Sequence, residues 1–341
     1  MPKGRVTLRD VADKVGVHPS TVSRVLSPDT QAMVSEEVAE RVRDVVAEMG
    51  YRANPFAYSL KTKRSRSIGV LIPDLTNPVF PPIIRGIEST LALNGYTAML
   101  ANADHDQKQE HVAVDAMRAR RVDGLILATA HRDDPLVAEC VEEGIPLVLI
   151  NRFVEGMNLL SVVIDDFAGM KMAVDHVISL GHRRIAHLAG PLAFSTGYER
   201  RQGYVDAMAA AGLPVDDDMI VVADEFSEEA GCAAIHKLLE ARPDITAVVT
   251  ANDLLALGCY DAAGARGVSC PAALSVTGYN DMPFVDKFHP ALTTVRIPHR
   301  KMGARAAALM LETLRDGYDG ARTIRLQPQL VVRDSTVPPR D

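Results

Sequence analysis

The feature that most constrains this chain is a run of short apolar repeats near its N-terminus, in residues 6–26. The first apolar residues have the i, i+3, i+4, i+7 spacing of one helix face: Leu8, Val11, Ala12 and Val15. Gly16 follows where a tight turn needs glycine, and Pro19 stands where the first residue of a helix tolerates proline. The apolar spacing then resumes at Val22, Val25 and Leu26. Two short helices joined by a turn that contains glycine predict a helix-turn-helix unit.

The outward face of the second helix indicates what this unit contacts. Its residues are small, polar or cationic: Pro19, Ser20, Thr21, Ser23 and Arg24. Such a face suits a helix that enters the major groove of double-stranded DNA. The simpler alternatives are a purely structural helical hairpin and, for Arg24, a surface cation with no partner.

The charges of the chain divide unevenly between its two parts. The net charge is −7, but residues 1–66 carry 12 Lys and Arg against 8 Asp and Glu, a balance of +4. The remainder carries 25 basic and 36 acidic residues, a balance of −11. This division keeps a positive field on the N-terminal part, where phosphates would lie.

Two further helical segments follow the helix-turn-helix pattern. A third helix begins after Ser35, a suitable N-cap, and ends at Gly50. Asn54, followed by a proline, starts a shorter helix that ends near Leu60, and a basic linker runs on to Arg66. Since so short a helix is marginal in water, we expect it to order only against DNA or a second copy of the chain.

From Ser67 onward, buried strands alternate with amphipathic helices in two similar series. This alternation predicts an α/β core of two doubly wound parallel-sheet lobes. The last helix, near 299–315, and the last strands, near 323–326 and 330–332, are expected to cross back between the lobes. The expected organisation is a helix-turn-helix domain at 1–50, a hinge helix and linker at 51–66, and a core at 67–341. Within the core, we expect an N-lobe of 67–164 and 298–322 and a C-lobe of 165–297 and 323–341.

Several classes of protein are disfavoured by what the sequence lacks. Its four cysteines form no C-x-x-C pair, and no secretion signal or long apolar run is present, so we expect a cytoplasmic protein without membrane contact. No phosphate-binding loop, dinucleotide fingerprint or nucleophile elbow occurs, so no cofactor and no catalytic residue is expected. His105 and His111 fit no standard zinc spacing, and a solvated charged face is the better interpretation of that stretch.

Motifs spread along nearly the whole chain resemble those of the lac repressor family of bacterial transcription regulators. They are residues 6–26, 51–55, 181–186, 250–253, 275–281 and 290–295. The resemblance implies a core similar to periplasmic sugar-binding proteins, with a small-molecule effector in the cleft between the lobes. It also implies a homodimer that binds a near-palindromic operator. The sequence lacks a leucine heptad after Pro339, which favours a dimer over a tetramer.

The resemblance assigns a DNA-binding role to ten positions. They are Thr7, His18, Pro19, Ser20, Thr21, Ser23, Arg24, Asn54, Ala57 and Leu60. Arg24 matches a residue that faces bases and could grip guanine, whereas Leu60 matches a wedge into the minor groove, with ordinary helix packing as its alternative. His18 departs from the Ser or Thr helix cap usual in the family, and capping and phosphate contact both stay open for it.

The resemblance assigns effector contacts to ten further positions. They are Asn77, Phe80, Thr129, Asn151, Arg152, Asp165, Arg200, Phe226, Asn252 and Asn280. Convergent polar groups with a stacking Phe suit a polyhydroxylated ligand, so a sugar or sugar derivative is favoured and a purine is the alternative. For Arg200 the alternative role is an interlobe salt bridge, for Asp165 a helix cap and for Phe226 core packing. Asn280 stands where many sugar-responsive members have Asp, which leaves the identity of the ligand open.

These observations favour a ligand-responsive repressor over two other classes. A solute-binding protein would carry a secretion signal and no basic N-terminal unit, which is the opposite of this sequence. A metabolic enzyme on the same scaffold would need a catalytic constellation, and none is found. In a repressor, the effector would change the relation between the lobes, and the lobe arrangement it prefers would decide whether DNA is released or held.

Overall fold

A computed structural model describes the chain in two compact units, Met1–Ser65 and Arg66–Asp341. The described residues are 6–26, 30–51, 64–317 and 321–340. The expected hinge residues Asn54, Ala57 and Leu60 therefore lie outside the described residues, and their DNA contacts stay predictions.

The N-terminal unit contains the helices that the apolar spacing predicts. Among the residues described for this unit they are α1 (Leu8–Val15), α2 (Pro19–Val25) and α3 (Glu36–Met49), and a 3-10 turn, η1 (Gln31–Met33), precedes α3. Gly16 ends α1 in the left-handed conformation, with φ of +77°, which is why glycine suits this turn. Val11, Val22 and Val42, one from each helix, are fully buried in a small shared core.

The first lobe of the core is a six-stranded parallel sheet with helices on both faces. Its strand order is β11-β5-β4-β3-β1-β2. The strands are β1 (Ser67–Ile72), β2 (Thr97–Asn102), β3 (Gly124–Leu127), β4 (Leu147–Ile150), β5 (Leu160–Ile164) and β11 (Thr323–Leu326). The helices are α5 (Phe80–Leu93), α6 (Gln107–Ala119), α7 (Pro135–Glu142) and α12 (His299–Asp316). Val70 and Ile72 pack in the cluster with α5 and α12, while Leu71 packs in the cluster with α6 and α7.

The second lobe repeats this plan with one reversed strand. Its order is β12-β10-β9-β8-β6-β7, and only β12 pairs antiparallel within this sheet as described. The strands are β6 (Ile185–Ala189), β7 (Ile220–Val222), β8 (Ala247–Thr250), β9 (Ser275–Asn280), β10 (Thr293–Arg296) and β12 (Gln329–Val331). The helices are α8 (Asp166–Ser179), α9 (Ser195–Ala210), α10 (Glu228–Ala241) and α11 (Asp253–Ala265), with 3-10 turns η2 (Asp217–Met219) and η3 (Val285–Lys287).

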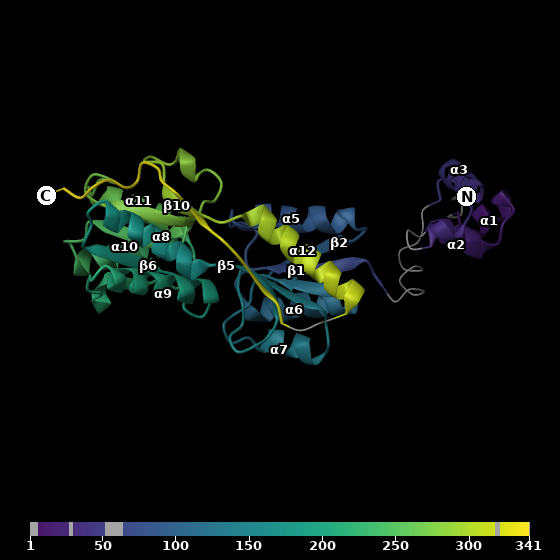
Figure 1. Cartoon of the computed structure of the whole chain (residues 1–341), viewed down its shortest axis with the longest axis horizontal. Helices are drawn as coiled ribbons and strands as arrows, with labels where there is room; N and C mark the ends of the chain where they lie inside the picture. The colour runs from purple at the N-terminus through teal and green to yellow at the C-terminus, as the bar shows by residue number, and fades with distance from the viewer. Residues whose placement is uncertain (1–5, 27–29, 52–63, 318–320, 341) are drawn as a thin grey trace. The chain divides into compact units, whose positions relative to one another are not determined.

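The chain passes between the lobes three times, after β5, after β10 and after β11 (Figure 1). The expected lobe boundary at 322/323 is wrong, because Thr323–Leu326 pairs with Ser161–Ile164 of β5 and thus completes the first sheet. The last crossing lies between Leu326 and Gln329. Strand β5 itself was not among the expected elements.

Close helix contact fixes α12 in the first lobe, beside α5 (Figure 1). A Cβ atom at Gly86 of α5 would lie 2.2 Å from the carbonyl oxygen of Arg300. A Cβ atom at Gly303 of α12 would lie 2.0 Å from the carbonyl oxygen of Ile83. Both glycines are therefore required by the space between the two helices, and α12 is an integral part of this lobe.

Two smaller expectations can be compared with the structure. All four cysteines are free. Across the described ranges, every helix is either too short or too polar to pass through a lipid bilayer.

Candidate functional site

The start of α2 is held by a histidine cap. The Nδ1 atom of His18 accepts a hydrogen bond from the backbone N–H of Ser20 at 3.2 Å and lies 2.8 Å from the Ser20 hydroxyl. Pro19 is the first helical residue, as the sequence predicts. The structure thus shows His18 as a cap, one of the two roles that the sequence left open.

The two faces of α2 differ as the sequence predicts. Val22 and Val25 are buried in the core of the N-terminal unit, whereas the Arg24 side chain is exposed. Ser20, Thr21 and Ser23 are half-buried. Thr7 forms a capping box with Asp10 at the start of α1, which gives Thr7 a local structural role whatever it contacts on DNA.

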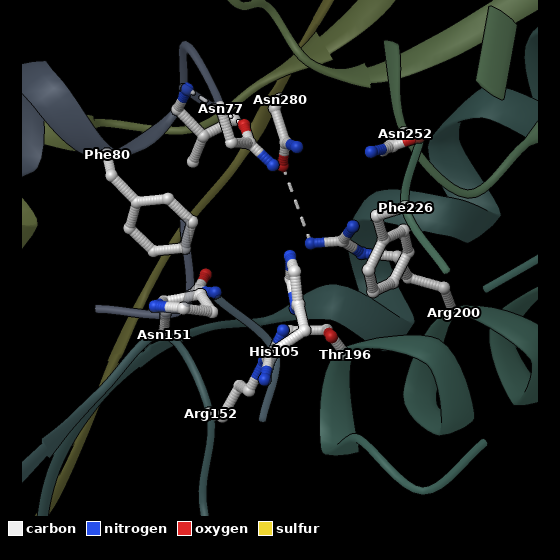
Figure 2. Close-up of a pocket in the computed structure, with 12 residues that line it drawn as sticks. Asn77, Phe80, His105, Asn151, Arg152, Thr196, Arg200, Phe226, Asn252 and Asn280 are labelled. Carbon is white, nitrogen blue, oxygen red and sulfur yellow. Dashed lines mark hydrogen bonds between the residues drawn. The ribbon is translucent and has the colours of Figure 1, made fainter. Parts of the chain in front are cut away.

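A pocket lies between the two lobes of the core (Figure 2). Its walls come from the ends of strands and the starts of helices in both lobes. The lining residues are Pro73, Asn77, Val79, Phe80, His105, Asn151, Arg152, Thr196, Arg200, Phe226, Asn252 and Asn280. The cavity has a volume of only about 30 Å³, which is space for one or two waters. The lobes lie close together around this space, and a sugar-sized ligand requires the space to widen.

Arg200 is a buried cation whose partners all belong to the second lobe. Its Nε atom donates to Asp166 Oδ1 at 2.9 Å, and Nη1 donates to the Ala251 carbonyl at 2.8 Å. Nη2 lies 3.5 Å from Asn280 Oδ1, as the dashed line in Figure 2 marks. Burial raises the pKa of the Asp166 carboxyl, and the charge of Arg200 opposes this rise. The alternative of an interlobe salt bridge is wrong, because Asp166 lies in the same lobe.

The loop after β9 is held in an unusual backbone conformation. Asn280 has φ of +108° and Asp281 has φ of +53°, values that side chains rarely adopt. Asp253, fully buried, accepts hydrogen bonds from the Met282 N–H at 2.8 Å and the Thr294 hydroxyl at 2.6 Å. Burial raises the pKa of Asp253 to about 7. These contacts fix the direction in which Asn280 enters the pocket.

Arg152, on the first-lobe wall, has fewer partners. It is 3% exposed, and its Nη1 atom donates to the Thr129 carbonyl at 3.1 Å. Its guanidinium lies 3.6 Å from the centre of the Phe194 ring of the second lobe, a cation–π contact across the cleft. Its buried Nε atom has no hydrogen-bond partner in the described structure.

Further contacts hold the lobes together beside the pocket. The Arg132 N–H donates to the Ala193 carbonyl at 2.8 Å, and its guanidinium lies 3.8 Å from the Tyr198 ring centre. Arg132 also pairs with Glu155 at 2.7 Å within its own lobe. These contacts link the loop after β3 to the start of α9 and stabilise the closed arrangement.

The structure brings together eight of the ten expected effector residues. Thr129 and Asp165 do not line the pocket. Thr129 is buried behind Arg152, and Asp165 caps α8 by accepting from the Ala168 N–H at 3.1 Å, which was its alternative role. Phe226 lines the pocket and is half-buried, so core packing alone does not describe it.

Three lining residues were not predicted from the sequence: Pro73, His105 and Thr196, whereas Val79 belongs to the predicted segment that runs from Asn77 to Phe80. Thr196 lies four residues before Arg200, so the helical period of α9 could have placed both on one face. His105 is exposed and borders the pocket, so a solvated charged face describes it only in part. In the parts of the chain that the structure describes, no three His, Cys, Asp or Glu side chains gather as metal ligands.

Two family models match the chain, one for each unit. Residues 7–54 match the model of bacterial regulatory proteins of the lacI family. Residues 65–334 match the model of periplasmic binding proteins and the sugar-binding domain of the LacI family. The chain belongs to the LacI family. This confirms both the helix-turn-helix unit and the two-lobed core that the sequence predicts.

Relatives match this LacI-family regulator over almost its whole length. The HTH-type transcriptional repressor CytR of Escherichia coli is 33% identical over 97% of this chain and 96% of its own. The lac repressor dimer bound to operator and the anti-inducer ONPF superimposes with a TM-score of 0.85 at 27% identity, covering 98% of this chain and 99% of that one. The CelR–cellobiose complex has a TM-score of 0.75 at 31% identity and covers 97% and 100%. This chain is accordingly a transcriptional regulator rather than an enzyme.

Proposed function

We propose that this regulator binds a palindromic operator in double-stranded DNA as a homodimer and acts as a repressor in the cytoplasm, at the chromosome. Arg24 reads a base in the major groove, because it is the exposed cation on the helix whose opposite face is buried. The hinge residues Asn54, Ala57 and Leu60 contact the minor groove in this proposal.

A small molecule that binds between the lobes controls DNA binding in this proposal. The observation that carries this proposal is the closed pocket, whose polar side chains come from both lobes. A ligand that contacts both walls stabilises one arrangement of the lobes over another, and this difference in affinity drives the response. The arrangement that fits the operator decides whether the ligand releases DNA or promotes its binding.

The lining chemistry favours a polyhydroxylated ligand. Four Asn side chains offer donors and acceptors together, and Phe80 and Phe226 offer faces for the apolar side of a sugar ring (Figure 2). The CelR structure is a complex with cellobiose, which agrees with a sugar or sugar derivative here. A purine is the second candidate, since the HTH-type transcriptional repressor PurR of Photorhabdus laumondii is 31% identical over 97% of this chain.

The DNA half of the proposal is tested on an operator selected from random DNA with the purified dimer. Arg24→Ala should lose roughly 1–3 kcal/mol on that operator and much less on unrelated DNA. The matched control is Arg43→Ala, because Arg43 lies on α3 and pairs with Glu36 at 2.9 Å. Equal losses on both DNAs would reduce Arg24 to a phosphate contact.

The effector half is tested with a variant that keeps the fold intact. Asn252 caps α11 by accepting from the Leu255 N–H at 2.9 Å, and Asp caps equally well. Asn252→Asp therefore keeps the helix cap and replaces the amide donor at the pocket with a carboxylate oxygen. We expect normal operator binding without ligand and a loss of response to a sugar found by thermal-shift screening. A normal midpoint of the effector titration would reject the pocket as the effector site.

A further inference from the structure

The charged side chains that line the pocket are all of one sign, positive. Its lining residues include two arginines, one histidine, one threonine and four asparagines, and none of these described lining residues is Asp or Glu. Neutral sugars are held by donors and acceptors in balance, because each hydroxyl both donates and accepts. A wall with cations and no lining carboxylate has an excess of donors.

The two arginines of the wall differ in how their charge is compensated. Arg200 is paired with Asp166 at 2.9 Å, so its charge is neutralised inside the second lobe. Arg152 is as deeply buried, yet within the described structure its polar contact is one neutral carbonyl, and its Nε atom has no partner. Burial lowers the pKa of Arg152 to about 9, and the charge of Glu110 opposes this fall although the described residues show no ion pair between the two side chains. A buried cation left in this state is costly unless an anion joins it.

A second group beside Arg152 also lacks a partner. The Thr196 hydroxyl is buried, with the residue 2% exposed, and has no hydrogen-bond partner among the described residues. Thr196 lies in the first turn of α9, a 16-residue helix whose N-cap, Phe194, has no side-chain group to accept from the first-turn N–H groups. The N-terminus of a helix attracts anions through these N–H groups and the helix dipole.

Arg152 lies directly at this helix start. Its guanidinium stacks on Phe194, the N-cap residue, at 3.6 Å, and the N–H of the neighbouring Phe153 donates to the Ser195 hydroxyl at 3.1 Å. Figure 2 shows Arg152, Thr196 and His105 on the same side of the pocket. A guanidinium, a free hydroxyl and a helix N-terminus are the groups that bind phosphate and carboxylate oxygens.

We infer that the effector carries an anionic group, a phosphate monoester or a carboxylate, which binds between Arg152 and the N-terminus of α9. This inference rests on the proposed function, since it names the chemical class of the ligand for the same pocket. The polyhydroxylated part of the ligand then lies toward Asn77, Asn252 and Asn280, on the opposite side. The binding energy comes from a direct ion pair to Arg152, which makes none within the described residues.

Matched ligands and matched variants test this inference in the full-length protein. Binding affinity is compared within two sets of compounds. The first set is glucose, glucose 6-phosphate and gluconate, and the second is ribose and ribose 5-phosphate. Inorganic phosphate is measured by itself. In parallel, the protein is dialysed against a bacterial metabolite extract, and mass spectrometry identifies the compounds that it enriches. We expect the enriched compounds to be anionic, and the phosphate and carboxylate arms identify which group is preferred.

Arg152→Met should weaken binding of the preferred anion at least about tenfold, because it removes the charge but keeps the apolar length. The control is Arg132→Met, since Arg132 also stacks on an aromatic ring of the second lobe but is paired with Glu155 and does not line this pocket. It should leave the affinity for the anion within about twofold.

Each contrary outcome is distinct. Enrichment of neutral sugars or nucleosides would overturn the anionic effector and leave a small-molecule effector in place. Enrichment of nothing would overturn this inference and the proposed effector together. Equal losses of anion affinity in both variants would show that Arg152 acts only by joining the lobes, which overturns its role as the anion ligand.

Discussion

The two walls of the interlobe pocket are built on different principles. In the second lobe, Arg200 is bonded to Asp166 and to Ala251, and Asn252 caps a helix, so the polar side chains are held before any ligand arrives. In the first lobe, Arg152 relies on one carbonyl and on an aromatic ring of the other lobe. The wall of the second lobe is therefore preorganised, whereas the wall of the first lobe depends on contacts with groups of the second lobe or of a ligand.

This difference shows that the burial of an arginine does not by itself determine how much the side chain contributes to the stability of the folded protein. Removing a buried charge that is hydrogen-bonded to its counterion leaves that partner uncompensated, but removing one without an ion pair, such as Arg152, costs only its weaker attraction to Glu110. The two walls should thus lose very different amounts of stability on the same kind of substitution.

The largest effect is expected at Arg200. Arg200→Met leaves Asp166, which is 2% exposed, without its cation, and should lower the free energy of unfolding by about 3–5 kcal/mol. Urea denaturation of the purified protein measures this loss. Adding Asp166→Leu in the same chain should recover most of it. A loss below about 1 kcal/mol would show that the second wall is not held by this pair.

A smaller effect on the free energy of unfolding should depend on pH. This dependence should differ between Asp253 of the second lobe and Asp134 of the first lobe. The folded pKa of Asp253 is raised to about 7 by burial, so the folded state keeps a proton that the unfolded state releases near 3.8. Stability from this group therefore falls as pH rises from 5 to 8, and Asp253→Asn should gain about 2 kcal/mol on wild type over that interval.

Asp134 of the first lobe provides the opposite case. Burial would raise the pKa of Asp134, but hydrogen bonds from His131 and the Val137 N–H outweigh it, so the pKa is lowered. Its contribution is present above the unfolded pKa and is lost only as pH falls through the lower folded pKa. The stability difference between Asp134→Asn and the unchanged carboxylate should stay constant from pH 5 to 8 when both chains also carry His131→Gln, which removes the imidazole 3.8 Å from Asp134. Parallel slopes for the two variants in urea unfolding would contradict the contrast.

The smallest effect is expected at Arg152. Arg152→Met exchanges an unpaired buried cation for an apolar side chain of similar length, and the lost stacking on Phe194 is offset by the desolvation that is no longer required. The free energy of unfolding should stay within about 1 kcal/mol of wild type. A loss as large as that of Arg200→Met would mean that an undetected partner compensates Arg152, and the two walls would then be alike.

Local signals in the sequence predicted more of the fold than of the pocket. The spacing from Leu8 to Val15, with Gly16 directly after it, lies within about two helical turns of the sequence and therefore identifies α1 without tertiary information. Strand β5 was missed because a loop, not a helix, joins it to β4, so it breaks the alternation on which the other strands were recognised.

Within the pocket, the sequence could place side chains but not their partners. Asp165 stands both at the end of β5 and before α8, and the same carboxylate suits a ligand or a cap. The pairing of Arg200 with Asp166 joins residues 34 positions apart in the sequence. The surroundings of Arg152 depend on the second lobe, which places the Phe194 ring and no carboxylate against its guanidinium. Contacts of this kind follow from tertiary packing, which no local pattern encodes.

The placement of α12 and β11 has a consequence for how the protein is made. The first lobe begins at Ser67, yet its sheet is closed by Thr323–Leu326 and its helix α5 is covered through Gly303. A ribosome must therefore synthesise every strand of the second lobe except β12 before the first lobe can close, and until then the apolar face of α5 lacks its partner. The first lobe is synthesised earlier, yet it must wait for these late elements with apolar surface uncovered, which is the condition that favours aggregation during synthesis.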